Sequence, residues 1–145
     1  MATARGDIRA ARTEAHVRKN LPVNECMSRL PSEVDRTERL SAVVDRMREQ
    51  QCHHIPVMDG SHLFGVLSRE DLHELSLRDN KAASDLVAGD VCTRELLTVG
   101  PLTPVVEVAR SMLERSVGSA LVTDGGVLVG IFTATDALRL IAEPR

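Results

Sequence analysis

The sequence predicts an α/β protein of the α+β type, in which two copies of one β-α-β-β-α unit pack sheet to sheet about a pseudo-twofold axis. Three observations predict this fold. The chain has 145 residues, of which 43% are hydrophobic, so it can form one domain or two small halves that share a core. It matches itself without a gap at an offset of 65 residues. Each copy also shows the same order of strand and helix patterns.

The repeat is visible in short matching segments. G-V-L-S-R-E-D at residues 65–71 aligns with G-I-F-T-A-T-D at residues 130–136, and Asp59-Gly60 aligns with Asp124-Gly125. Other identities fall at positions expected for strands, turns and helix starts, which indicates a duplicated unit. A unit of roughly 60 residues buries too little surface to be stable alone. We therefore expect the two halves to share a core.

Each unit begins with a short strand, around Val34 in the first copy and Val99 in the second. A helix with one apolar stripe follows, because apolar residues recur at every third or fourth position. The stripe residues are Leu40, Val43, Val44 and Met47 in the first copy, and Val105, Val108, Ala109, Met112 and Leu113 in the second. Thr103-Pro104 predicts an N-cap threonine followed by proline at the first helical position.

Two strands joined by a tight turn come next in each copy, at residues 54–58 and 63–67 and at residues 119–123 and 128–132. The Asp-Gly pairs between them favour hairpin turns. Glycines stand in the second strand of each pair, Gly65 and Gly130, where another group can approach the backbone closely. The last helix of each copy is expected to begin at Ser68 and at Thr133.

The Ser68–Asp71 and Thr133–Asp136 corners have two interpretations, and one residue can serve both. In a capping box, the hydroxyl accepts a hydrogen bond from a backbone amide and the carboxylate accepts one from the N-cap amide. In a binding corner, the carboxylate accepts the two hydroxyls of a ribose. The free amides of the helix N-terminus then suit a polar or anionic ligand.

These motifs resemble those of the CBS domain, and the tandem resembles a CBS pair, or Bateman module. The resemblance is carried in the first copy by V-N-E-C-M-S (23–28), H-I-P-V-M-D-G (54–60) and G-V-L-S-R-E-D-L (65–72). In the second copy it is carried by G-D-V-C-T-R-E-L-L-T-V (89–99), A-L-V-T-D-G-G (120–126) and G-I-F-T-A-T-D (130–136). It implies repeats at residues 22–78 and 88–142, a linker at 79–87, and tails at 1–21 and 143–145.

The resemblance implies a stand-alone regulatory module, of the energy-sensing kind, that binds an adenosine-type ligand: AMP, ADP, ATP or S-adenosylmethionine. Two pockets are implied in the cleft between the repeats, in which a hydroxyl and an aspartate hold the ribose and apolar residues enclose the adenine. Carried over residue by residue, the first pocket consists of Asp136, Thr133, Thr135 and Ile131, closed by Cys52 and His53. The second consists of Asp71, Ser68 and Val66, closed by Val117 and Gly118.

The two pockets are expected to differ. Thr135 adds a hydroxyl to the first, whereas Glu70 stands at the matching position of the second and repels phosphate. Gly118 stands where many family members carry a basic residue or histidine, which favours a ligand of lower charge. We therefore expect Asp136 to contribute more to binding than Asp71. The candidate phosphate contacts are the arginines and histidines near the corners, namely Arg69, His53, His54, Arg115 and Arg139.

Several other partners are not expected. Proteins that bind single-stranded nucleic acid stack bases on aromatic side chains, and this chain has no Trp or Tyr. No apolar run approaches the roughly 18 residues of a membrane span. The first 20 residues lack the apolar core of a signal peptide. We therefore expect a cytoplasmic protein with no nucleic-acid and no membrane partner.

Catalytic and metal sites are not expected either. Cys52, His53 and His54 are adjacent, but adjacent residues of a strand point to opposite faces, so only Cys52 and His54 could share one. Zinc needs about four converging ligands. No P-loop or nucleophile elbow is present. The cysteines, Cys26, Cys52 and Cys92, are interpreted as small buried apolar residues. The sequence thus predicts a non-enzymatic chain that requires no metal or cofactor.

Two roles remain open from the sequence: a ligand sensor that signals to an effector protein in trans, and a ligand-free interaction scaffold. The signal would arise because the ligand binds two arrangements of the chain with different affinities. The CBS resemblance implies a homodimer formed through the helices, although the helix stripes are equally consistent with an intramolecular core. The first 20 residues, with five Lys or Arg against two acids, are the segment left to dock a partner.

Overall fold

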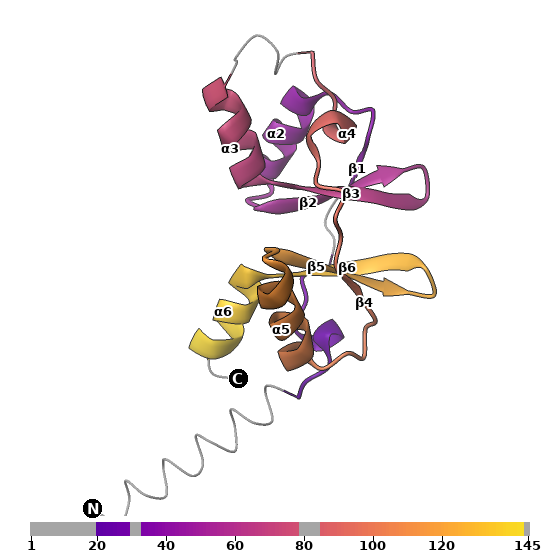
Figure 1. The fold of residues 1–145 in the computed structure, drawn as a ribbon, viewed down its shortest axis with the longest axis vertical. Helices are drawn as coiled ribbons and strands as arrows, with labels where there is room; N and C mark the ends of the chain where they lie inside the picture. Colours follow the sequence, from indigo (N-terminus) through magenta and orange to yellow (C-terminus); the bar gives the residue numbers. More distant parts are fainter. Residues whose placement is uncertain (1–19, 30–32, 79–84, 144–145) are drawn as a thin grey trace, which may run out of the picture. The chain divides into compact units, whose positions relative to one another are not determined.

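The computed structural model describes residues 20–29, 33–78 and 85–143 (Figure 1). The chain divides into two compact units at Arg29/Leu30 and at Leu96/Leu97. We call residues 30–96 the Asp71 unit, and residues 97–145 together with the segment up to Arg29 the Asp136 unit. The predicted tails and linker lie wholly or partly outside the described residues. The repeat boundaries drawn from the sequence therefore stay predictions.

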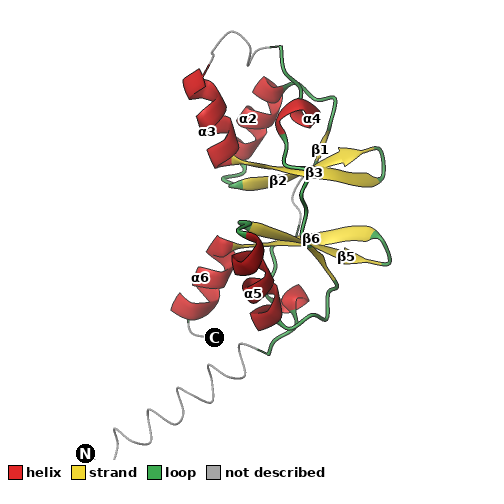
Figure 2. Cartoon of the chain, viewed as in Figure 1, coloured by secondary structure: helices red, strands yellow, loops and turns green. Residues whose placement is uncertain are grey.

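The Asp71 unit follows the predicted β-α-β-β-α order. It contains β1 (Val34–Asp35), α2 (Leu40–Glu49), β2 (His54–Asp59), β3 (His62–Ser68), α3 (Arg69–Arg78) and the short α4 (Ala88–Val91). Its sheet has the order β1-β2-β3, with β1 parallel and β3 antiparallel to β2. The mixed α/β content and the element order of the prediction are confirmed (Figure 2).

The Asp136 unit repeats this order. It contains η1 (Val23–Glu25), β4 (Thr98–Val99), α5 (Val105–Arg115), β5 (Ser119–Asp124), β6 (Val127–Thr133) and α6 (Ala134–Ala142). Its sheet has the order β4-β5-β6, with the same parallel and antiparallel pairings. The register also repeats, because Val57 faces Gly65 in one unit and Val122 faces Gly130 in the other.

The hairpin turns form where the Asp-Gly pairs predict them. Gly60 and Gly125 have φ values of 61° and 57°, which glycine adopts without the steric penalty that a side chain brings. Each hairpin also contains a register shift, after Val57 and after Val122. The turns therefore reverse the chain at the same place in both copies.

The predicted helix stripes form the cores. In the Asp71 unit, Leu40, Val43 and Met47 are buried in a cluster with Ile55, Val57 and Leu67. In the Asp136 unit, the corresponding residues of α5 are Val105, Val108 and Met112. They are buried in a cluster with the strand residues Ala120, Val122 and Phe132. The interpretation of the stripes as intramolecular core is confirmed for these residues, but it was wrong for Leu113, whose side chain is 81% exposed. The prediction for the start of α5 was wrong, since the N-cap is Pro104 and Thr103 makes no cap bond.

The first segment of each sequence repeat packs into the unit formed by the other repeat. Val23, near the start of the first repeat, belongs to the core of the Asp136 unit, and its amide donates to the Thr103 carbonyl over 2.8 Å. Ala88, at the start of the second repeat, belongs to the core of the Asp71 unit. Each compact unit is therefore built from both repeats. Within the described residues, no helix is long and apolar enough to cross a membrane.

Candidate functional site

The Asp136 corner lies where β6 ends and α6 begins. Thr133 is the N-cap, with extended backbone at φ −116° and ψ 168°. Its hydroxyl accepts a hydrogen bond from the Asp136 amide over 3.3 Å. Asp136 Oδ2 in turn accepts from the Thr133 amide over 2.9 Å and from the Thr133 hydroxyl over 3.0 Å. The predicted capping box is therefore confirmed, and it occupies one carboxylate oxygen.

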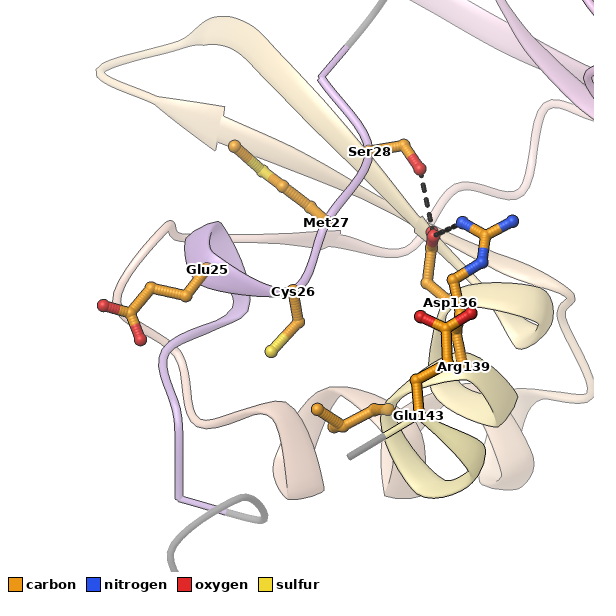
Figure 3. A pocket seen from close by; sticks show the side chains of 8 residues that line it. Glu25, Cys26, Met27, Ser28, Asp136, Arg139 and Glu143 are labelled. Carbon is orange, nitrogen blue, oxygen red and sulfur yellow. Dashed lines mark hydrogen bonds and ion pairs between the residues drawn. The ribbon is translucent and has the colours of Figure 1, made fainter. Parts of the chain in front are cut away.

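The second oxygen of Asp136 is also engaged (Figure 3). Oδ1 accepts a hydrogen bond from the Ser28 hydroxyl over 2.9 Å and lies 3.7 Å from a guanidinium nitrogen of Arg139. Ser28 is held in place by two backbone hydrogen bonds to Ile131, of 2.9 and 3.0 Å. The Asp136 side chain is only 6% exposed. A buried carboxylate needs such partners, and this one has polar contacts on both oxygens.

The Asp71 corner has the same box with fewer contacts. Asp71 Oδ2 accepts from the Ser68 amide over 3.3 Å, and the Ser68 hydroxyl accepts from the Asp71 amide over 3.1 Å. Thr93 takes the place of Ser28, since it forms two backbone hydrogen bonds to Val66, but its side chain is exposed. Among the described residues, Asp71 Oδ1 accepts no hydrogen bond. This carboxylate is half-buried, and the described part of the chain leaves one of its oxygens available.

The two glycines that the repeats share, Gly65 and Gly130, are approached by the protein's own chain. A Cβ on Gly130 would overlap the side chain of Met27, and a Cβ on Gly65 would lie 2.6 Å from Cys92 Sγ and 2.7 Å from the Thr93 carbonyl oxygen. The expectation of a close approach is therefore confirmed, and the approaching group is the first segment of a repeat. In each unit this segment lies beside the corner that carries the aspartate.

A small cavity lies on the helix side of the Asp136 corner (Figure 3). It has a volume of about 210 Å³ and is lined by η1, the residues after it and α6, namely Glu25, Cys26, Met27, Ser28, Asp136, Arg139, Leu140 and Glu143. Ligand pockets usually have volumes of about 300–1,000 Å³. This unit alone therefore does not enclose a nucleotide in that cavity.

An open hollow of about 560 Å³ lies at the Asp71 corner, lined by His53, Arg69, Glu70, His73 and Glu74. The His53 carbonyl accepts a hydrogen bond from the Arg69 amide over 2.8 Å. Two predicted phosphate contacts, His53 and Arg69, are thus brought together, and His73 joins them without having been predicted. Glu70 and Glu74 place negative charge in this hollow beside the positive charge of Arg69.

The other predicted residues are distributed over both units. Ile131 is buried in β6, Thr135 is exposed in the first turn of α6, and Arg115 is exposed at the end of α5. His53 and Gly118 were each expected to close the pocket of the opposite corner, but each lies beside the corner of its own unit. The His53 carbonyl accepts a hydrogen bond from the Arg69 amide, and the Gly118 carbonyl accepts one from the Ala134 amide over 3.2 Å. Cys52 and Val117 precede these residues, and Val66 and His54 lie in β3 and β2. The pairing of residues across the two units stays a prediction.

Ser28 is the contact that sequence reasoning missed. The segment V-N-E-C-M-S carried part of the family resemblance, but no role followed from it. The available signal was the repeat itself, because Ser28 and Thr93 are equivalent at the 65-residue offset and both carry a hydroxyl. Local patterns do not reveal a hydrogen bond that joins residues 108 positions apart.

Two of the cysteines, Cys52 and Cys92, lie in environments that do not favour nucleophilic chemistry. Burial raises the pKa of the Cys52 thiol and, by the same cause, the pKa of the Cys92 thiol. A raised pKa lowers the fraction of reactive thiolate at neutral pH. In the part of the chain that the structure describes, no three His, Cys, Asp or Glu side chains form a group that could hold a metal ion.

A family model for the CBS domain matches residues 23–78 and 88–143. The chain belongs to the CBS domain family. The two matches cover both copies of the repeat, so the resemblance first seen in the corner motifs is confirmed. CBS domains are generally regulatory modules, and the two units described above form a CBS pair.

Three similar proteins illustrate the range of the family. An inosine-5′-monophosphate dehydrogenase of Korarchaeum cryptofilum is 32% identical over 101 residues, which cover 68% of this chain and 20% of that enzyme. The CBS domain of a CBS domain-containing membrane protein of Sphaerobacter thermophilus is 25% identical, with a TM-score of 0.76 over 93% of this chain and 96% of that one. The structure of CBSX2 in complex with AMP is 28% identical, with a TM-score of 0.69 over 83% and 96% of the chains. This chain thus spans about a fifth of the enzyme it matches.

Proposed function

We propose that this CBS pair is a non-enzymatic, cytoplasmic sensor that binds an adenosine-type ligand at its strand-to-helix corners and signals to a partner protein in trans. The candidate ligands are AMP, ADP, ATP and S-adenosylmethionine, and no other cofactor is required. One observation carries the proposal: both units hold a hydroxyl and a carboxylate in the same box at the start of a helix. The AMP complex of CBSX2, a structural relative, supports an adenosine ligand.

The chemistry of the corner suits a ribose. A carboxylate accepts hydrogen bonds from both hydroxyls of a diol, and hydrogen bonds to a charged acceptor are stronger than neutral ones. At Asp136 the ribose takes the place of the Ser28 hydroxyl on Oδ1, so one charge-assisted bond replaces another. At Asp71 the ribose meets an available oxygen, but the neighbouring Glu70 opposes a phosphate group.

We assign the Asp136 corner as the preferred site for a nucleotide. Arg139 lies beside its carboxylate and has a side chain that is 58% exposed, so its guanidinium can turn to a phosphate. Arginine suits phosphate oxygens because of its planar, forked donors. The counterpart of Arg139 in the other unit is Glu74, which repels phosphate.

The direct test uses the missing aromatic residues. With no Trp or Tyr, the purified protein absorbs little between 260 and 280 nm, so a bound adenine is visible as a band near 260 nm. Mass spectrometry of the denatured protein then identifies the released compound. If the spectrum is blank and none of the four candidate ligands raises the melting temperature, the sensor proposal is wrong.

Matched variants test the assignment of the corner. Asn has the shape of Asp and keeps one accepting oxygen, so Asp136→Asn and Asp71→Asn remove the charge with little change in shape. Calorimetric titration with AMP should show a larger loss for Asp136→Asn, by about tenfold or more for one charge-assisted hydrogen bond. Equal losses would contradict the assignment.

A ligand-free interaction scaffold is the second candidate, and a specific observation favours it. The aspartates, hydroxyls and glycines of both corners already have structural roles, since they form capping boxes and accommodate Met27 and Cys92. A protein that binds no ligand would keep these residues for stability alone. The ultraviolet spectrum and the thermal titration distinguish the two functions.

A further inference from the structure

Two arginines of the Asp71 unit lie against the ring of Phe64 in β3. The guanidinium carbon of Arg94 lies 3.7 Å from the ring centroid, and that of Arg36 lies 5.1 Å from it. Both distances are within the ~6 Å range of a cation–π attraction. Phe64 also packs against the core of the unit, so its ring is a fixed platform for both positive charges.

Backbone contacts hold this cluster together. The Arg36 carbonyl accepts a hydrogen bond from the Gly89 amide over 2.8 Å. The chain passes so close at this point that a Cβ on Gly89 would lie 3.0 Å from the Cβ of Arg36 and 3.6 Å from the Phe64 ring. On the other arginine, Arg94 Nε donates to the Phe64 carbonyl over 3.0 Å. Both arginines are therefore positioned by the fold.

The other copy of the repeat shows that the fold does not require the cluster. At the 65-residue offset, the ring and one of the two arginines are absent. The residues equivalent to Arg36, Phe64 and Arg94 are Pro101, Val129 and Arg29. The Asp136 unit forms the same three-stranded sheet with these residues. Two like charges held at one ring repel each other, so the cluster is better explained by binding than by folding.

The two guanidinium groups keep hydrogen-bond donors for a ligand. Arg94 uses Nε for the Phe64 carbonyl, and Arg36 uses Nε for an exposed ion pair of 3.5 Å with Asp59. Among the described residues, no acceptor bonds the terminal nitrogens of either group. These nitrogens form the planar fork that binds a carboxylate through two parallel hydrogen bonds. The Arg36 side chain is 45% exposed, so an external carboxylate can reach it.

We propose that Arg36, Phe64 and Arg94 form a docking surface for a short acidic segment of a partner protein, whose carboxylates pair with the two guanidinium groups. The inference rests on the proposed signalling in trans only for the existence of a partner, and it does not depend on the adenosine ligand. The surface also lies apart from the Asp71 corner. Phe64 and Ser68 are separated by four residues of β3, or about 13 Å along the strand.

Acidic residues around the arginines limit the size of the partner's anionic segment. Asp59 is paired with Arg36. Three further acids are sequence neighbours of the arginines or of Gly89, namely Asp35, Asp90 and Glu95. Nucleic acids and anionic membranes bind to wider basic patches, and these carboxylates repel an extended polyanion. A short acidic segment can place its carboxylates on the arginines alone, and this favours a protein partner.

Fluorescence anisotropy of a labelled peptide that contains a run of glutamates tests the docking surface. The full chain without nucleotide should bind this peptide with a dissociation constant below about 1 mM, and should not bind the same peptide with glutamine at each glutamate. Arg94→Gln should weaken binding by about tenfold, the effect of losing one charge-assisted pair. Phe64→Leu should also weaken it, because leucine keeps an apolar contact with the core but removes the platform. Arg29→Gln is the matched control, since it removes the same charge at the equivalent position beside Val129, and should leave binding unchanged.

Circular dichroism checks that the variants fold, and glutamine at position 94 keeps an amide that can donate to the Phe64 carbonyl. Failure of the wild-type chain to bind the glutamate peptide at about 1 mM would overturn the proposal. Equal weakening by Arg29→Gln would also overturn it, because the peptide would then respond only to overall charge. A single-stranded DNA oligomer of equal charge that binds more tightly, and that Arg94→Gln releases, would assign a nucleic acid as the partner instead. Since no nucleotide is present, none of these outcomes alters the ultraviolet test of the adenosine site.

Discussion

The aspartates of the two corners should differ in how much they stabilise the protein. Both close a capping box, but within the described residues only Asp136 is also bonded through its second oxygen, to the Ser28 hydroxyl and to Arg139. We predict that Asp136→Ala destabilises the protein more than Asp71→Ala does. The substitution removes a buried carboxylate and leaves the Ser28 hydroxyl without its acceptor.

The magnitude follows from the contacts that differ. Loss of a capping side chain costs about 0.5–2 kcal/mol and applies to both variants. The hydrogen bond from Ser28 to a charged acceptor contributes a further ~1.5–3 kcal/mol. Arg139 adds less than about 1 kcal/mol, because its side chain is 58% exposed. The expected difference in the free energy of unfolding is therefore about 2 kcal/mol.

Thermal unfolding followed by circular dichroism measures this difference. For a chain of this size, about 2 kcal/mol corresponds to a melting temperature lower by roughly 4–8 °C for Asp136→Ala than for Asp71→Ala. Ser28→Ala combined with Asp136→Ala should lower it little further, since the two residues share one bond. Equal melting temperatures for the two aspartate variants would refute the reasoning.

Three further predictions concern the same corners. Gly65→Ala should destabilise the protein by about 1–3 kcal/mol in urea unfolding, because the added methyl meets the Thr93 carbonyl; Gly130→Ala should cost less, since it meets only a flexible Met side chain. Burial raises the pKa of the Cys52 and Cys92 thiols, so both should be alkylated more slowly than free cysteine at pH 7. Their alkylation should become faster as the pH approaches the raised pKa, and peptide mass spectrometry measures the rate at each cysteine. Ser28→Ala should bind AMP more tightly in calorimetry, because the ribose no longer competes for Asp136; unchanged affinity would contradict ribose binding at Oδ1.

The repeat made most of the fold predictable. Periodic apolar residues predicted α2 and α5, the Asp-Gly pairs predicted both hairpins, and the Ser-x-x-Asp and Thr-x-x-Asp motifs predicted the starts of α3 and α6. These signals are local, because each depends on residues within one turn or one strand pair. The start of α5 was misplaced by one residue, since Pro104 has a non-helical ψ of 135° and is the N-cap instead of the first helical residue.

The tertiary contacts could not be predicted in the same way. The exchange of first segments between the units, and the Ser28–Asp136 bond that depends on it, join residues far apart in sequence. A glycine at position 130 within a strand predicted that another group comes close, but not that this group is Met27. The position of Leu113 was also mispredicted, because the apolar stripe of its helix included it and its side chain proves to be 81% exposed.

The Ser28 contact connects the proposed ligand site to the rest of the chain. Ser28 belongs to a segment that packs in the Asp136 unit, and the chain passes into the Asp71 unit only two residues later, at Leu30. A ribose that takes Oδ1 of Asp136 releases the Ser28 hydroxyl, while the backbone bonds to Ile131 still hold the segment. The occupied and empty states then differ by one partly buried hydrogen bond, close to the point where the chain leaves one unit for the other. A ligand shifts an equilibrium only through such a difference in interactions, so Ser28 is where occupancy of the corner can first affect the chain beyond it.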